Sequence, residues 1–134
     1  DRHCENAVQV AQYLREHAQV EWVNYAGLTD HPDHDLVQKY MGGKAASILC
    51  FGIKGGREAG ARFIDALQLV VRLVHIGDAK TLACHPATTT HRQLSPDELA
   101  SAGVSEDLVR LSIGIENIDD IITDIDQALA AART

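Results

Sequence analysis

Residues 109–116 place the strongest constraint on the fold, because apolar side chains alternate there with polar or small ones without interruption. The apolar positions are Val109, Leu111, Ile113 and Ile115, and the positions between them are Arg110, Ser112, Gly114 and Glu116. Successive side chains of a β-strand point to opposite faces of its sheet. The segment is therefore predicted to be a strand buried on one face, which other elements must cover.

Helical spacing of apolar residues predicts the covering elements. Longer helices are predicted at residues 4–17, 59–70 and 118–129, and a shorter one at residues 36–40. Another begins at Ser95, where the sequence Ser-Pro-Asp-Glu forms a capping box with proline at the first helical position. The first of these helices has no evident packing partner of its own.

Three further strands are predicted, at residues 20–25, 47–54 and 73–77, and residues 78–94 are predicted to be irregular. Helices packed on a small sheet make the fold class α/β. No repeat or linker divides the chain, and 134 residues with a hydrophobic share of 46% are enough for one core. The prediction is one domain, residues 1–134.

The charge balance and the lack of long apolar runs limit the possible partners. The net charge is −7 and the positive residues are scattered, so we expect no binding to nucleic acid or to an anionic membrane. No stretch reaches the ~20 apolar residues of a membrane span. The three cysteines have no paired spacing, which favours a reducing compartment, and the expected location is the cytoplasm.

Arg110 is the first candidate for a binding role. Its neighbours on the same face of the predicted strand are Ser112 and Gly114, whose small size would let a ligand approach the guanidinium. A guanidinium can bind a carboxylate through two parallel hydrogen bonds. The alternative is an arginine on the solvent-facing side of a one-sided sheet, and the pattern leaves both readings open.

The long predicted loop is the second candidate. It carries threonines at positions 88–90 between His85 and His91, and loops of this length in small domains are often functional. Hydroxyl and imidazole groups could bind an anionic ligand or relay protons. Equally, the threonine side chains could cap their own backbone.

Histidine pairs and a lysine beside two glycines are weaker candidates. Neither His31 with His34, nor His85 with His91 and Cys84, matches the spacing of a closed metal site, so no metal ligand is predicted. Lys54 precedes a pair of glycines that could receive a phosphate. A simple turn from strand to helix explains those glycines equally well, and we favour it.

Seven segments, taken in order, resemble one family over nearly the whole chain. They are NAVQVAQYL, VEWVNYAGL, HPDH, GGKAASILCFGIKGG, RFIDALQL, GDAKTLACHPATTTHRQL and VRLSIGIENIDDIITDIDQAL. The chain is similar to the C-terminal part of the pyridoxal 5'-phosphate (PLP) enzymes of Cys/Met metabolism. Within that family, the HPATTTH and KGG motifs look most like O-acetylhomoserine sulfhydrylases.

The resemblance implies a fold and a division of roles. It implies the C-terminal domain of a type I PLP-dependent transferase, a small and mostly antiparallel sheet with helices packed on it. A larger domain upstream would carry the cofactor lysine, so the resemblance assigns no catalytic or cofactor-binding residue to this chain. It implies two substrate-binding residues: Arg110 for the α-carboxylate, and Thr81 at a position where the family usually has a serine.

The implied reaction of the intact enzyme makes homocysteine from O-acetylhomoserine and sulfide, in a homotetramer. Other reactions of the family, of the cystathionine γ-synthase or methionine γ-lyase type, remain open. A third hypothesis is a standalone module that binds an amino acid or mediates oligomerisation without doing chemistry.

Overall fold

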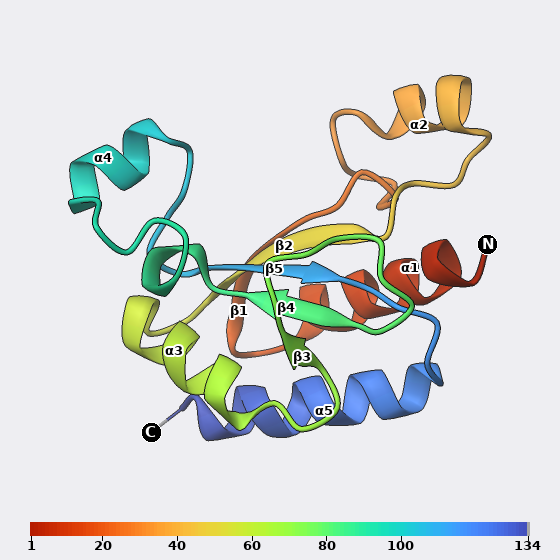
Figure 1. Ribbon diagram of the computed structural model, residues 1–134. Helices are drawn as coiled ribbons and strands as arrows, with labels where there is room; N and C mark the ends of the chain where they lie inside the picture. The colour runs from red at the N-terminus through yellow and green to blue at the C-terminus, as the bar shows by residue number, and fades with distance from the viewer. Residues whose placement is uncertain (134) are drawn as a thin grey trace.

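The computed structural model describes residues 1–133 and shows a sheet with its three longest helices gathered on one face (Figure 1). The helices are α1 (Arg2–Glu16), α2 (His34–Met41), α3 (Gly56–Ala66), α4 (Pro96–Ser101) and α5 (Ile118–Ala131), with a 3-10 turn η1 (Pro86–Thr88). The strands are β1 (Val20–Asn24), β2 (Ile48–Ile53), β3 (Val71–Arg72), β4 (Leu82–Cys84) and β5 (Leu108–Ser112). None of the helices within residues 1–133 is long and apolar enough to cross a membrane.

The strand order is β1-β2-β5-β4-β3. All neighbouring pairs are antiparallel except β3 and β4, which are parallel. The predicted α/β class with a mostly antiparallel sheet is therefore confirmed, and the sheet is mixed. Parallel neighbours need a crossover connection, and residues 73–81, which we call the crossing segment, provide it.

The core lies between the sheet and the helices α1, α3 and α5. Strand β5 contributes Val109 and Leu111, both with no exposed surface, as the alternating pattern predicts. Phe51 of β2 meets Phe63 of α3 edge to face, with 5.6 Å between the ring centroids. Helix α1 packs on both the sheet and α5, so the helix that had no evident partner has two.

The prediction was wrong in the region of β3 and β4. Residues 73–77 were expected to form a strand, but the edge strand is Val71–Arg72 and the crossing segment follows it. Strand β4 lies inside the stretch expected to be irregular. All of Leu82–Cys84 is buried, so the strand shows no alternation for a sequence pattern to reveal.

The two faces of the sheet are covered differently. Figure 1 shows α3 and α5 below the sheet, while α2 and α4 stand away from it on the opposite side. On that side the crossing segment passes over β4 and β5 on its way from β3 (Figure 1). The sheet face without long helices is the one on which Arg110 lies.

Candidate functional site

Arg110 sits at the middle of β5, the central strand of the sheet. Its register partner on β2 is Cys50 and its partner on β4 is Cys84. Side chains of directly opposed residues share a face, so the guanidinium stem stands between two thiols. The side of β5 that carries Val109 and Leu111 is turned to the helices, which leaves Arg110 on the other side.

The guanidinium is held by the main chain of the crossing segment. Its Nη2 donates to the Val74 carbonyl at 2.5 Å and lies 3.4 Å from the His75 carbonyl. Every hydrogen bond described for Arg110 uses this one nitrogen, so the Nε and Nη1 donors stay available. These two donors lie on different edges of the guanidinium, and a bidentate contact on either edge also needs an N–H of Nη2, so a carboxylate bound in that way would have to share Nη2 with the carbonyls or displace them.

The two cysteines beside Arg110 keep their protons. Burial raises the pKa of Cys50 and the pKa of Cys84, while the positive charge of Arg110 opposes both shifts. Because the thiols stay neutral, neither of them supplies a negative charge to Arg110. The thiols on both sides of the guanidinium are therefore neutral, and so are the carbonyls that accept its Nη2 hydrogen bonds. The positive charge of Arg110 is not neutralised by these partners, which favours the binding of an anionic ligand.

Thr81 is fully buried at the end of the crossing segment. Its backbone N–H donates to Glu116 Oε1 at 2.6 Å and its hydroxyl donates to Glu116 Oε2 at 2.8 Å. The same hydroxyl oxygen accepts the Gly114 N–H at 2.9 Å. Thr81 and Arg110 thus lie along the same contact between the crossing segment and β5, but no hydrogen bond described for residues 1–133 joins them.

The space expected beside Arg110 is filled by the chain itself. The Ser112 hydroxyl accepts the Gly77 N–H at 3.1 Å, and Ser112 is only 1% exposed. A Cβ added to Gly114 would lie 2.3 Å from the Ala79 carbonyl oxygen. The small residues therefore let the crossing segment approach β5, and a ligand would have to reach the guanidinium from another side.

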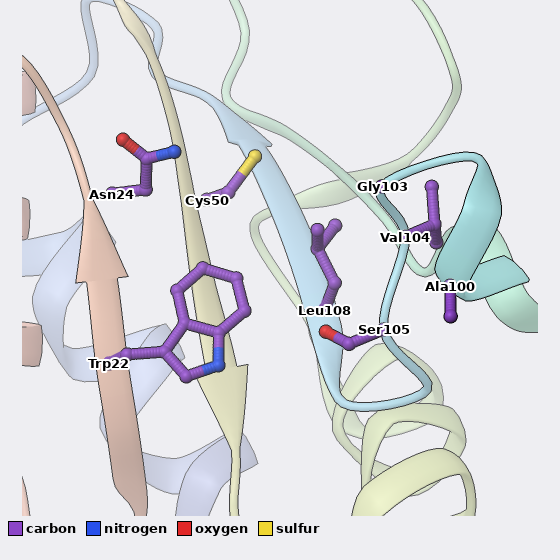
Figure 2. A pocket seen from close by; sticks show the side chains of 8 residues that line it. All are labelled: Trp22, Asn24, Cys50, Ala100, Gly103, Val104, Ser105 and Leu108. Carbon is purple, nitrogen blue, oxygen red and sulfur yellow. The ribbon is translucent and has the colours of Figure 1, made fainter.

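An open cavity of about 460 Å³ lies on the β1 side of the sheet and is lined in part by Cys50, the register partner of Arg110 (Figure 2). Its sheet wall consists of Trp22, Asn24, Cys50 and Leu108, and its other wall consists of Ala100, Gly103, Val104 and Ser105 (Figure 2). The Trp22 indole N–H donates to Asp107 at 2.8 Å, which fixes the ring over Gly52. Sequence reasoning missed this cavity, although Trp22 and Asn24 alternate along a predicted strand.

The threonine-rich loop caps its own backbone. The hydroxyls of Thr88 and Thr89 donate to the His85 carbonyl at 3.2 and 2.9 Å. His85 itself is buried, with Nε2 2.8 Å from the Glu106 carbonyl, and burial lowers its pKa. The more exposed Thr90 pairs with His91. The structural alternative for Thr88 and Thr89 is therefore the one observed.

Neither the lysine candidate nor the metal candidates form a site around Arg110, and of these candidates only Cys84 lies beside it. Lys54 donates to the Ala18 carbonyl at 2.6 Å, and the glycines after it form a left-handed turn into α3, with φ 98° at Gly55. Within residues 1–133 no group of three possible metal ligands is present.

Comparison with known proteins places the chain in a family. The family described as Cys/Met metabolism PLP-dependent enzyme matches residues 1–130. O-acetyl-L-homoserine sulfhydrylase 1 of Thermus thermophilus is 53% identical over 97% of this chain and 31% of its own length. L-methionine gamma-lyase of Pseudomonas putida is 47% identical over 98% of this chain and 33% of its own length.

A solved structure shares the fold. It is described as an O-acetylhomoserine (thiol)-lyase of Campylobacter jejuni carrying a pyridoxyl-lysine monophosphate. It superposes with a TM-score of 0.87 at 42% identity, covering 96% of this chain and 31% of that chain. This chain spans about a third of the length of the relatives it matches. The chain belongs to the family of PLP-dependent enzymes of Cys/Met metabolism.

Proposed function

We propose that this chain is the C-terminal domain of an O-acetylhomoserine sulfhydrylase and that Arg110 binds the α-carboxylate of the amino-acid substrate. The observation that carries the proposal is the state of Arg110, held by a carbonyl through Nη2 alone, with Nε and Nη1 available beside neutral thiols. The similarity to the sulfhydrylases of Thermus and Campylobacter supports the choice of reaction.

Arg110 would orient the substrate rather than react with it. Charge-assisted hydrogen bonds from the guanidinium hold the carboxylate in place and so restrict the motion of the attached Cα. PLP, bound elsewhere in the intact enzyme, supplies the electron sink. The overall conversion replaces the acetate of O-acetylhomoserine by sulfide, giving homocysteine and acetate.

The wider arrangement is part of the same proposal. A larger upstream domain would carry the cofactor lysine, and the intact enzyme would be a cytoplasmic homotetramer. Thr81 stays a predicted substrate-binding residue, and because its hydroxyl hydrogen already goes to Glu116 it could offer a ligand only an acceptor. Light scattering of the full-length enzyme tests the tetramer.

A second candidate is a methionine γ-lyase, because a relative with that name is 47% identical. Both reactions use an α-amino acid, so the carboxylate contact of Arg110 does not separate them. Assays of the full-length enzyme with O-acetylhomoserine plus sulfide, and with methionine alone, decide between the two. A full-length protein without either activity would favour a non-catalytic amino-acid-binding module.

The Arg110→Ala substitution in the full-length enzyme tests the binding role. Removing one partner of a paired charge costs about 2–5 kcal/mol, so kcat/KM for O-acetylhomoserine should fall by at least tenfold. The KM for sulfide, which has no carboxylate, should change little. An unchanged kcat/KM for O-acetylhomoserine would contradict the proposal.

A further inference from the structure

The crossing segment is tied to β5 and to the residues after it by a ladder of polar contacts. The rungs, from one end to the other, are Arg110 to Val74, Ser112 to Gly77, Ile115 to Ala79, and Gly114 and Glu116 to Thr81. The first rung is the hydrogen bond from the Arg110 guanidinium to the Val74 carbonyl. The last rung is the pair of hydrogen bonds from Thr81 to the Glu116 carboxylate.

Polar contacts must hold this segment, because its large side chains are poorly packed. Leu73 is 47% exposed, Val74 is 46% exposed and Ile76 is 55% exposed. Burial of apolar surface therefore contributes little to keeping the segment over β5. The position of the Val74 carbonyl, and with it that of the guanidinium, depends on the rungs of the ladder and on the Leu73 N–H, which donates to the Ala83 carbonyl of β4 at 3.1 Å.

The strongest rung is at Glu116. Each oxygen of its carboxylate accepts one hydrogen bond from Thr81, at 2.6 Å from the backbone N–H and at 2.8 Å from the hydroxyl. The Gly114 N–H closes the group by donating to the same hydroxyl at 2.9 Å. Hydrogen bonds to an ionised acceptor are roughly twice as strong as neutral ones.

This rung is fixed to the body of the fold. The side-chain amide of Asn6, on α1, donates to the carbonyls of Gly114 and Glu116 at 3.1 and 3.0 Å. His3 Nδ1 lies 2.7 Å from the Ile113 carbonyl. Because Asn6 is fully buried, the Glu116 end of the ladder is fixed to α1. The crossing segment extends from this fixed end to Val74, whose carbonyl contacts Arg110.

We infer that Glu116 is a positioning residue for Arg110: it anchors the crossing segment at Thr81, and that segment holds the guanidinium through the Val74 carbonyl. The inference rests on the proposed function, in which Arg110 binds the substrate carboxylate. Glu116 touches neither substrate nor Arg110 in this role. Its effect is on the geometry with which the carboxylate is received.

Glu116→Gln in the full-length enzyme tests the inference, because the amide keeps the size of the side chain but can accept from only one of the two Thr81 donors. Loosening of this kind should raise the KM for the amino-acid substrate by about three- to tenfold, with a smaller change in kcat. Hydrogen exchange at Gly77, whose N–H does not contact Glu116, should become faster because the segment is freer.

Thr81→Val provides a second test if Glu116→Gln folds poorly. It should speed hydrogen exchange at Gly77 and raise KM, and the exchange is the deciding readout, because Thr81 is itself a predicted substrate-binding residue and its KM could rise through a lost substrate contact. Thr81→Ser keeps the hydroxyl, so its hydrogen exchange at Gly77 should stay closer to that of the parent enzyme than in Thr81→Val. Glu98→Gln is the matched control, since Glu98 also accepts from the N–H and hydroxyl of one residue, Ser95, in the capping box of α4. It should leave KM unchanged.

The outcomes separate the two proposals. If Arg110→Ala raises KM while Glu116→Gln and Thr81→Val do not, the positioning role is wrong and the carboxylate-binding role stands. If Arg110→Ala has no effect, the proposed function fails first. Faster hydrogen exchange at Gly77 together with an unchanged KM also overturns the positioning role. The crossing segment would then be more mobile, but substrate binding would not depend on its position.

Discussion

At the scale of single residues, several buried polar groups have their hydrogen-bonding capacity met by backbone. Asp124, on α5, is 6% exposed and accepts the N–H groups of three consecutive residues, Gln68, Leu69 and Val70, at 2.8 to 2.9 Å. A buried carboxylate without such donors would be unfavourable. Here the aspartate fixes the loop that leads into β3.

Asp124→Ala should therefore destabilise the chain strongly. The substitution leaves three backbone N–H groups without their acceptor, and we expect a loss of about 2–4 kcal/mol in the free energy of unfolding. Urea denaturation of this chain measures it. Asp120→Ala, which removes an exposed carboxylate from the first turn of the same helix, should cost less than about 1 kcal/mol. Equal losses for the two variants would contradict the role of Asp124.

His85 makes the stability of the chain depend on pH. Burial lowers its pKa, so the folded chain binds a proton at this site less readily than the unfolded chain does, whose histidine has a pKa of about 6.5. The stabilising effect of neutral His85 is complete above about pH 6.5 and is lost as the pH falls from there towards the folded pKa.

Denaturation midpoints between pH 8 and pH 5 check this expectation. The parent chain should lose stability over the acidic part of the range. The His85→Gln variant should be less stable than the parent chain at pH 8, but its loss of stability between pH 8 and pH 5 should be smaller. A variant that shows the same pH dependence as the parent chain would exclude His85 as the cause.

At the scale of elements, β5 and the crossing segment behave as one unit. The strand was predicted over residues 109–116, and its regular pairing ends at Ser112. Beyond that point Gly114 and Glu116 bond to Thr81 instead of to a strand. Alternation in the sequence reports which side each residue faces, but it does not report which backbone lies against it.

Gly114→Ala should weaken this unit. The added methyl group would lie 2.3 Å from the Ala79 carbonyl oxygen and 2.6 Å from a backbone atom of Lys80, so the backbone has to move. Overpacking of this kind costs about 1–3 kcal/mol. Thermal unfolding compared with Ile115→Ala, a change at a half-exposed neighbour, measures it. A Gly114→Ala variant as stable as the parent would show that the two segments separate easily.

At the scale of the whole molecule, the chain combines a well-packed helical face with a sheet face that is only partly covered. Three long helices bury one side, while the other side carries Arg110, the cavity lined by Cys50 and Trp22, and the exposed apolar residues of the crossing segment. The relatives are about three times as long as this chain. We expect the partly covered face to work together with the rest of the enzyme.

The chain alone should not form a specific adduct with PLP. The Lys54 ammonium already donates to the Ala18 carbonyl at 2.6 Å. After incubation with PLP and reduction with borohydride, mass spectrometry should find only scattered, substoichiometric lysine modification. A single saturable adduct at Lys54 or Lys80 would overturn the expectation that the cofactor lysine lies outside this chain.

The sequence by itself determined the elements whose signals are local. The alternation around Arg110, the capping box at Ser95 and the helical spacing in α1 each predicted an element that the structure contains, because side-chain period and end-capping act within a few residues. The order of segments also indicated the family, and with it Arg110 as the candidate for binding a carboxylate.

Only the tertiary structure decided what surrounds that arginine. Cys50 and Cys84 come to flank it through strand pairing, and the Val74 carbonyl reaches it through a crossover, over separations in the chain that no local pattern spans. The sequence did not predict strand β4, because all three of its residues are buried and the strand therefore has no alternation of apolar and polar side chains. Contacts between distant segments depend on how the whole sheet is assembled, which is why the link from Glu116 to Arg110 could be seen only in three dimensions.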